Sequence, residues 1–153
     1  MNRTLSIMML LPVILPGCQS QPEIAPQPVE LVQWSGETGG ADTPRSEVIR
    51  TAEDWSSIWQ RIGREPPRPL DPPGEMAVAI ELGVKFTGGY SVEVAGTRVQ
   101  AGALVVDYRE IAPPPGALVT QSLTNPWVIA VMPASSLPVV FRGYRILGRH
   151  AGE

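Results

Sequence analysis

Cysteine and histidine are almost absent from this sequence of 153 residues, which has one of each, Cys18 and His150. A single cysteine excludes an internal disulfide framework, and one cysteine with one histidine cannot supply the ligands of an ordinary zinc site. His150 lies in a polar segment with no neighbouring element to orient it, as a catalytic histidine requires. We therefore expect no metal site and no catalytic histidine.

Positive charge is also scarce. Lysine and arginine number 12 against 15 aspartates and glutamates, so the net charge is -3. A chain without a basic excess cannot neutralise many phosphates, and we expect no nucleic-acid partner. The nucleophile-elbow, zinc-protease, P-loop and dinucleotide-binding motifs are all missing. We expect no catalytic residue, no cofactor and no enzymatic activity.

Proline and glycine, in contrast, are abundant, with 17 and 15 residues. They allow many turns and interrupt long helices, which excludes a helical bundle or a coiled coil. The sequence contains no internal repeat that would indicate a solenoid.

The amino-terminal segment is typical of an export signal. Arg3 precedes an apolar run from Leu5 to Leu15 that is too short to span a bilayer, and Cys18 follows directly after Pro16-Gly17. The end of this run resembles the lipobox of bacterial lipoproteins, with Pro16 in a position where a smaller residue is usual. The resemblance implies cleavage after residue 17 and lipidation of Cys18, which would anchor the chain to a membrane. The alternatives are plain secretion into the periplasm or the medium.

Residues 18–28 are polar and rich in proline, as expected of an extended tether. Gln19 follows Cys18 where some bacteria place an aspartate that retains lipoproteins in the inner membrane. We therefore expect a cell-envelope protein, placed in the outer membrane by default if the host has two membranes. The predicted organisation is a signal peptide over residues 1–17, a tether over 18–28, one domain over 29–149 and a tail over 150–153.

A helix is predicted between Thr51 and Gly63. Thr51 is a suitable N-cap with an acid three residues later, and Gly63 is a suitable stop. Apolar residues follow at helical spacing on one face, namely Trp55, Ile58, Trp59 and Ile62. This face is expected to pack on a sheet as part of the core; the alternative is an aromatic binding face.

From Glu75 onward the apolar period changes from 3.6 to 2, which indicates strands. The expected strands cover 75–82, 90–95, 104–109, 127–132 and 139–147, with an earlier one at 29–35. Residues 45–50 fit either a short strand or the approach to the helix, and Ala101-Gly102 suits a tight hairpin turn. The predicted fold class is mainly β (α+β), an antiparallel, sandwich-like sheet with one amino-terminal amphipathic helix packed on it. The solvent face is expected to carry Glu81, Glu93, Asp107 and Arg109.

Two segments carry specific motifs, GVKFTGGYSVEV from Gly83 and YREIAPPPGALVTQSLTNPWVIAVMP from Tyr108. Together they resemble the PrcB-type C-terminal domain, a family named for a lipoprotein subunit of a bacterial surface protease complex. The shared positions are Gly83, Thr87, Gly88, Gly89, Tyr90, Ser91, Tyr108, Arg109, Glu110, Pro113, Pro115, Gly116, Val119, Thr120, Gln121, Thr124 and Pro126. Trp127 replaces a tyrosine usual in the family, and Ala117 stands where many members have cysteine. The resemblance covers about Ala77 to Phe141 and implies an accessory role beside a secreted or surface serine protease.

Three loops within these segments combine residues that stiffen the chain with aromatic side chains. Glycine frees the backbone for turns and proline restricts it, so such loops lose little entropy when they bind. The candidate protein-binding residues are Thr87, Gly88, Gly89, Tyr90, Pro113, Pro115, Gly116, Asn125, Pro126 and Trp127. The alternative for each loop is that it only closes its own pair of strands.

Three functions fit these observations. The first is a membrane-anchored, non-enzymatic protein-binding subunit of a protease complex. The second is a protease inhibitor that inserts loops into its target, suggested by Thr87-Gly88-Gly89-Tyr90 and Asn125-Pro126-Trp127. The third is an envelope lipoprotein that binds a small ligand or glycan by stacking on Trp34, Trp55, Trp59 and Trp127.

Overall fold

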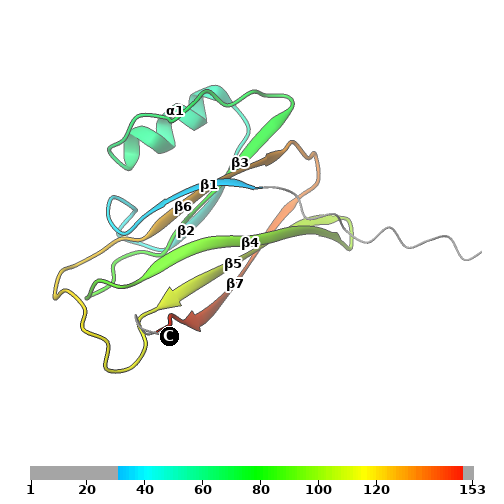
Figure 1. The fold of residues 1–153 in the computed structure, drawn as a ribbon. Helices are drawn as coiled ribbons and strands as arrows, with labels where there is room; N and C mark the ends of the chain where they lie inside the picture. The colour runs from blue at the N-terminus through cyan, green and yellow to red at the C-terminus, as the bar shows by residue number, and fades with distance from the viewer. Residues whose placement is uncertain (1–30, 150–153) are drawn as a thin grey trace, which may run out of the picture.

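A computed structural model describes residues 31–149. The predicted signal peptide, Cys18, the tether over 18–28 and the tail over 150–153 lie outside the described residues. The described chain forms three layers: one helix, a four-stranded sheet, and a three-stranded sheet (Figure 1). The mainly β, sandwich-like fold class predicted from the alternating pattern is confirmed.

The elements follow one another along the chain in the order β1, β2, α1 and then β3 to β7. Their bounds are β1 Val32–Gly36, β2 Arg45–Ile49, α1 Ala52–Arg61, β3 Glu75–Glu81, β4 Ser91–Gln100, β5 Ala103–Ala112, β6 Trp127–Pro133 and β7 Val139–Leu147. The segment over 45–50, which fitted two structures, is therefore a strand.

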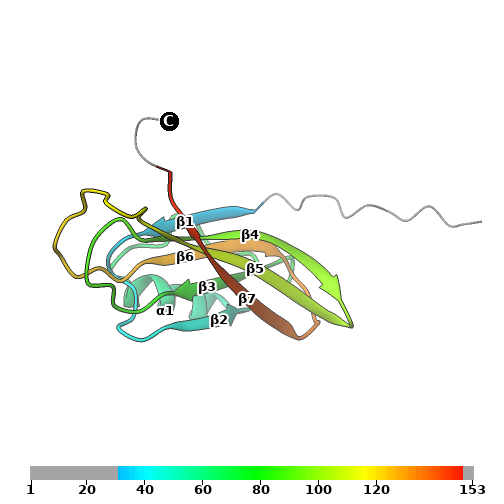
Figure 2. The same cartoon turned by 90° about the horizontal axis from the view of Figure 1, so that it is seen from below.

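The four-stranded sheet has the order β1-β6-β3-β2, with every neighbouring pair antiparallel. Its central strands β3 and β6 are buried along almost their whole length. The helix covers one face of this sheet and the three-stranded sheet covers the other, as the view from below also shows (Figure 2). Because both faces of the sheet are covered, residues 76–80 of β3 are all apolar. Met76, Val78 and Ile80 face the three-stranded sheet, and Ala77 and Ala79 face the helix.

The three-stranded sheet has the order β4-β5-β7. Its first two strands form a hairpin whose turn residues Ala101 and Gly102 have φ of 50° and 76°, which confirms the predicted tight turn. The sequence predicted an antiparallel sheet, but the pair β5-β7 is parallel. The reason is that β6, which lies between them in sequence, belongs to the other sheet, so the chain returns to β5 in the same direction.

Helix α1 begins and ends where its sequence predicts, to within two residues. The Thr51 hydroxyl accepts a hydrogen bond from the Asp54 backbone N–H at 3.0 Å, and Gly63 follows the helix with φ of 72°. Trp55, Ile58 and Trp59 are buried against the four-stranded sheet. The expectation that this face is core is confirmed.

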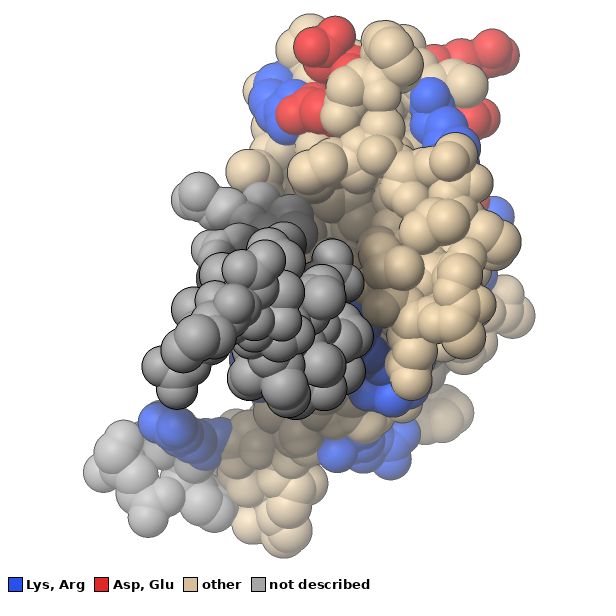
Figure 3. Space-filling model, turned by 90° about the vertical axis from the view of Figure 1, so that its right-hand side faces the viewer, with Lys and Arg blue, Asp and Glu red and all other residues tan. Residues whose placement is uncertain are grey.

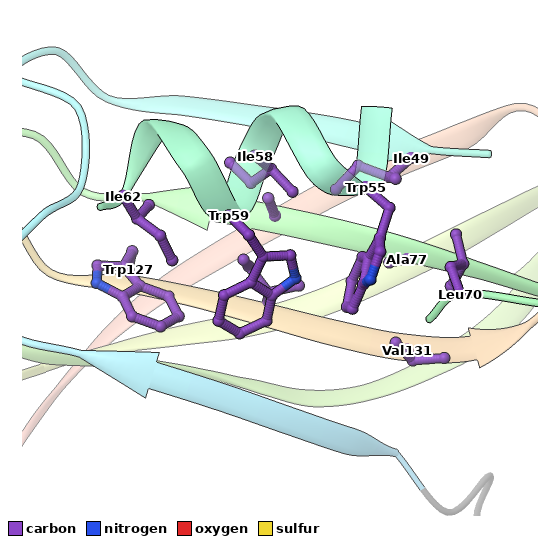
Figure 4. Packing of buried hydrophobic residues seen from close by; sticks show 11 residues of the cluster. Ile49, Trp55, Ile58, Trp59, Ile62, Leu70, Ala77, Trp127 and Val131 are labelled. Carbon is purple, nitrogen blue, oxygen red and sulfur yellow. The ribbon is translucent and has the colours of Figure 1, made fainter. Parts of the chain in front are cut away.

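Four tryptophans fill the layer between the helix and the sheet, and Figure 4 shows three of them, Trp55, Trp59 and Trp127. Trp59 makes edge-to-face contacts with Trp34, Trp55 and Trp127, with ring centroids 5.7, 5.4 and 5.9 Å apart. Such arrangements place the positive edge of one ring against the negative face of the next. These rings pack edge to face against one another, so the hypothesis that a ligand stacks on them gains no support from the structure.

The second apolar cluster lies between the two sheets. It contains Met76, Val78, Ile80, Leu82, Val92, Val94, Leu104, Val106, Val128, Ala130 and Met132. Burial of such side chains contributes about 1.5–3 kcal/mol each relative to exposure, so this cluster holds the sheets together.

Glu81, expected on a solvent face, is 2% exposed. It lies on the β3 face that α1 covers, where one carboxylate oxygen accepts the Ala41 backbone N–H at 2.7 Å. The other lies 3.2 Å from an Arg61 guanidinium nitrogen and 3.6 Å from one of Arg45. The prediction was wrong because alternation alone does not reveal that a helix covers the second face.

Candidate protein-binding loops

Three loops lie together at one end of the sandwich, the left side in Figure 1. They cover residues 37–44, 82–90 and 113–126, between β1 and β2, β3 and β4, and β5 and β6. Backbone hydrogen bonds join the last two loops reciprocally between Lys85 and Thr124, at 2.8 and 3.0 Å. The binding segments predicted at 87–90, 113–116 and 125–126 thus lie in the second and third of these loops, which form one connected surface.

The segment Thr87-Gly88-Gly89-Tyr90 is fixed against the loop over 113–126. Gly89 has φ of 82°, the left-handed conformation expected of it. Gly88 is required for a different reason: a Cβ there would lie 2.2 Å from the Thr120 hydroxyl oxygen. The Thr87 carbonyl accepts the Thr124 hydroxyl at 3.0 Å, and the Lys85 ammonium lies 5.3 Å from the centroid of the Tyr90 ring.

The proline run folds into one turn at the edge of the surface. The Ala117 backbone N–H donates to the Pro114 carbonyl at 3.1 Å, and Gly116 has φ of 79°. Proline followed by a glycine of positive φ at the two central positions is typical of a type II turn. Pro115 and Gly116 are exposed at its tip, whereas Pro113 lies beside Gly89.

Asn125 connects the surface to the loop over 37–44. Its backbone N–H donates to the Glu37 carbonyl at 2.9 Å, and its carbonyl accepts from Gly40 at 3.0 Å. Its side-chain amide donates to the Asp42 carboxylate at 3.0 Å. The loop over 37–44, to which the sequence assigned no role, thus becomes part of the same rigid end.

Three of the predicted binding residues, Gly88, Pro126 and Trp127, are not on the surface. Pro126 is buried, and Trp127 is 0% exposed with its indole N–H donating to the Thr38 carbonyl at 2.9 Å. A Cβ on Gly36 would lie 2.7 Å from that indole nitrogen, so the ring passes directly over the glycine. Trp127 starts the buried strand β6 and belongs to the core, so its assignment to a binding surface was wrong.

Three apolar side chains that were not predicted as binding residues point outward from these loops. Phe86 is 81% exposed, Leu118 103% and Leu123 63%. Phe86 and Leu123 lie one residue from the Lys85–Thr124 bridge, on the two loops that it connects. The sequence could have indicated them, because each is an apolar residue inside a polar, glycine-rich or threonine-rich loop. Such a loop has no core in which to bury the side chain. We call Phe86, Leu118 and Leu123 the apolar tip.

The carboxylates of the sheets are paired with arginine or lysine. The Arg109 guanidinium donates a hydrogen bond to the Glu93 carboxylate, and this bond raises the pKa of Arg109 above its ordinary value. Asp107 and Glu110 are each shared by two cations. Within residues 31–149, no three histidine, cysteine, aspartate or glutamate side chains are grouped so that they could hold a metal ion. In the same range, no helix has the length and apolar character needed to cross a membrane.

The fold and these loops together define the class of protein. It is a small, mainly β domain with one helix covering a sheet and three loops joined by hydrogen bonds at one end. Residues 76–133 match the family model described as PrcB C-terminal, which confirms the resemblance inferred from the motifs. The match runs from β3 to the end of β6 and includes the second and third loops. This family is one of accessory domains and is not a known catalytic family. No curated protein and no solved structure matches the chain.

Proposed function

We propose that this protein is a non-enzymatic accessory subunit that binds a protein partner through the apolar tip, and that the partner is a secreted or surface protease. The observation that carries the proposal is the exposure of Phe86, Leu118 and Leu123 on loops that are bonded to one another. Burial of exposed apolar side chains makes the free energy of binding more favourable, and side chains on a rigid frame lose little conformational entropy when they bind. The family match supports the accessory role.

The proposal includes anchoring of the chain to the cell envelope through Cys18. It is supported by the sequence of the first 18 residues. Strand β1 begins at Val32, which pairs with Val131, and ends at Gly36, which pairs with Trp127 next to the loops. The chain therefore enters the domain at the end opposite to the apolar tip (Figure 1). A tether attached there leaves the tip free to meet a partner.

Affinity capture tests this function. The tagged full-length chain is expressed in its source organism, and proteins retained from detergent-solubilised membranes are identified by mass spectrometry. We expect a peptidase to be retained in stoichiometric amount. A triple variant with Phe86, Leu118 and Leu123 each changed to Asp should lose it.

The matched control changes Val32 and Val99 to Asp, since these residues are 46% and 66% exposed but lie outside the loops and outside β7. Both variants must keep the thermal unfolding midpoint of the wild type. Equal retention of the peptidase by all three proteins would exclude the apolar tip as the binding surface. Inhibition of the retained peptidase by the purified chain would instead indicate the inhibitor function.

A further inference from the structure

Strand β7 has an open outer edge. Leu104 donates its backbone N–H to Pro138 at 2.9 Å, and Gly148 donates to Ala112 at 2.8 Å. In a parallel pair with this register, the even-numbered residues of β7 bond to β5, and the odd-numbered residues direct N–H and C=O outward. Among residues 31–149, no strand pairs with this outer edge. Phe141, Gly143 and Arg145 thus present backbone donors and acceptors in a row.

The two sides of the sandwich differ. On one side, the Gln33 side chain of β1 accepts the Val94 backbone N–H of β4 at 3.0 Å and so bridges the sheets. On the other side, a hollow of about 730 Å³ lies between β2 and β7 and is lined by Arg45, Glu81, Lys85, Glu110 and Tyr144, among others. The open edge of β7 therefore borders a space that side chains of an added strand can enter.

The charges beside this edge are unbalanced. The Asp107 carboxylate is shared by Arg98 and Arg142, with an Arg142–Asp107 distance of 2.7 Å. The Glu110 carboxylate is shared by Lys85 and Arg145, both at 3.0 Å. Each carboxylate thus serves two cations. The first group lies on the outer face of the sheet and the second on the face toward the hollow, because successive residues of a strand alternate.

The surplus cations are also accessible. The side chains of Arg142 and Arg145 are 64% and 63% exposed. Figure 3, which looks along the sheets from the hairpin end, shows Lys and Arg at the side of the three-stranded sheet, whereas the acidic side chains in view lie at the opposite side, where other Lys and Arg accompany them. A strand that adds to β7 therefore meets positive charge on either of its faces.

We infer that the outer edge of β7 binds an extended acidic segment of another protein, which adds a fourth strand to the β4-β5-β7 sheet. Backbone hydrogen bonds would supply pairing and carboxylates would meet Arg142 and Arg145. A second copy of this chain is disfavoured because two paired β7 strands would bring four arginines together. This surface is separate from the apolar tip, so the inference does not depend on the proposed function.

A designed peptide tests the inference on the full-length chain purified in detergent. The probe has nine residues, repeats the triplet valine-glutamate-glutamate so that both of its faces carry carboxylates, and has blocked ends. Its first control replaces every glutamate by lysine, and its second carries N-methyl groups on the amides that would face β7. We expect the acidic peptide to bind at least tenfold more tightly than either control, measured by calorimetry.

Amide hydrogen exchange locates the bound peptide. Amide protons of Phe141, Gly143 and Arg145 should gain protection, whereas those of Arg142 and Tyr144, already bonded to β5, should change little. Arg145→Glu should weaken binding of the acidic peptide at least threefold. The matched variant Arg64→Glu makes the same charge change at an exposed residue after α1 and should leave binding unchanged.

Three results would overturn the inference. Equal binding of the N-methylated peptide would show attraction by charge without strand pairing. Protection confined to residues other than the odd-numbered ones of β7 would place the peptide elsewhere. A concentration-dependent dimer of the wild type, found by sedimentation and protecting the odd-numbered amides of β7 from exchange, would assign the edge to a second copy instead.

Discussion

The ring of Tyr108 on β5 lies directly over Gly143 on β7. The two residues are paired in the parallel register, and a Cβ on Gly143 would lie 2.4 Å from Cζ and 2.5 Å from the hydroxyl oxygen of Tyr108. The glycine thus provides the space in which the tyrosine crosses the neighbouring strand. This contact helps to hold β7, whose other edge is open.

Gly143→Ala should therefore destabilise the protein by about 1–3 kcal/mol, because either the ring or the strand must move to admit the methyl group. Urea unfolding followed by circular dichroism measures the change. Gly96→Ala on β4 is the control, since a Cβ there meets nothing within 4 Å. Equal losses for the two variants would show that the cost comes from the backbone rather than from Tyr108.

Trp127→Ala should lower the free energy of unfolding by about 3–5 kcal/mol, because it empties a buried site between helix and sheet. Leu118→Ala should change it by less than about 0.5 kcal/mol, because the side chain is fully exposed. Chemical denaturation compares the two. A small loss for Trp127→Ala would contradict its place in the core.

Glu81→Gln should cost about 1–3 kcal/mol, because the amide cannot satisfy the donors of Ala41 and Arg61 that converge on the buried carboxylate. Glu47→Gln is the matched control: Glu47 also pairs with Arg61, but its side chain is 28% exposed, so its loss should stay below about 1 kcal/mol. Thermal unfolding at pH 7 distinguishes the two. A larger loss for Glu47→Gln would place the important ion pair at the surface.

The pair Arg68–Glu75 should make stability depend on pH. Arg68 donates two hydrogen bonds of 2.8 Å to the Glu75 carboxylate, and these lower the pKa of Glu75 below its ordinary value of 4.5. A lowered folded-state pKa stabilises the fold above the ordinary value, and this stabilisation is lost as the pH falls through the lowered pKa. Glu75→Gln should therefore lose up to about 1 kcal/mol at pH 7, with a difference from wild type that shrinks in acid.

Denaturation at a series of pH values between 7 and 3 measures this difference. The double variant Arg68→Gln/Glu75→Gln should lose little more than either single variant, because each removes the same interaction. A difference that stays constant as the pH falls would show that Glu75 acts through packing rather than through its charge.

Local features of the fold could be predicted because their causes lie within a few residues. Thr51 caps the helix through a bond to a residue three positions on, and the Ala101-Gly102 turn needs only its own backbone geometry. The turn at Pro115-Gly116 is of the same kind. The family resemblance was also legible, since its motifs are contiguous.

The candidate site was predicted only in part. The loop residues from Thr87 to Tyr90 and the turn at Pro115 and Gly116 lie at one end, as expected. Trp127 was assigned to the surface because an aromatic after Asn-Pro suits an exposed loop equally well. Phe86, Leu118 and Leu123 were overlooked because apolar residues are ordinarily expected in the core.

The sequence by itself determined the helix, the hairpin turn and every strand except the segment over 45–50, because capping, alternation and turn geometry are local properties. Only the tertiary structure decided that α1 covers Glu81, that β7 runs parallel to β5, and that three separate loops meet at one end. Each of these depends on contacts between residues far apart in the chain, where packing of whole layers, rather than the preference of any short segment, sets the lowest free energy.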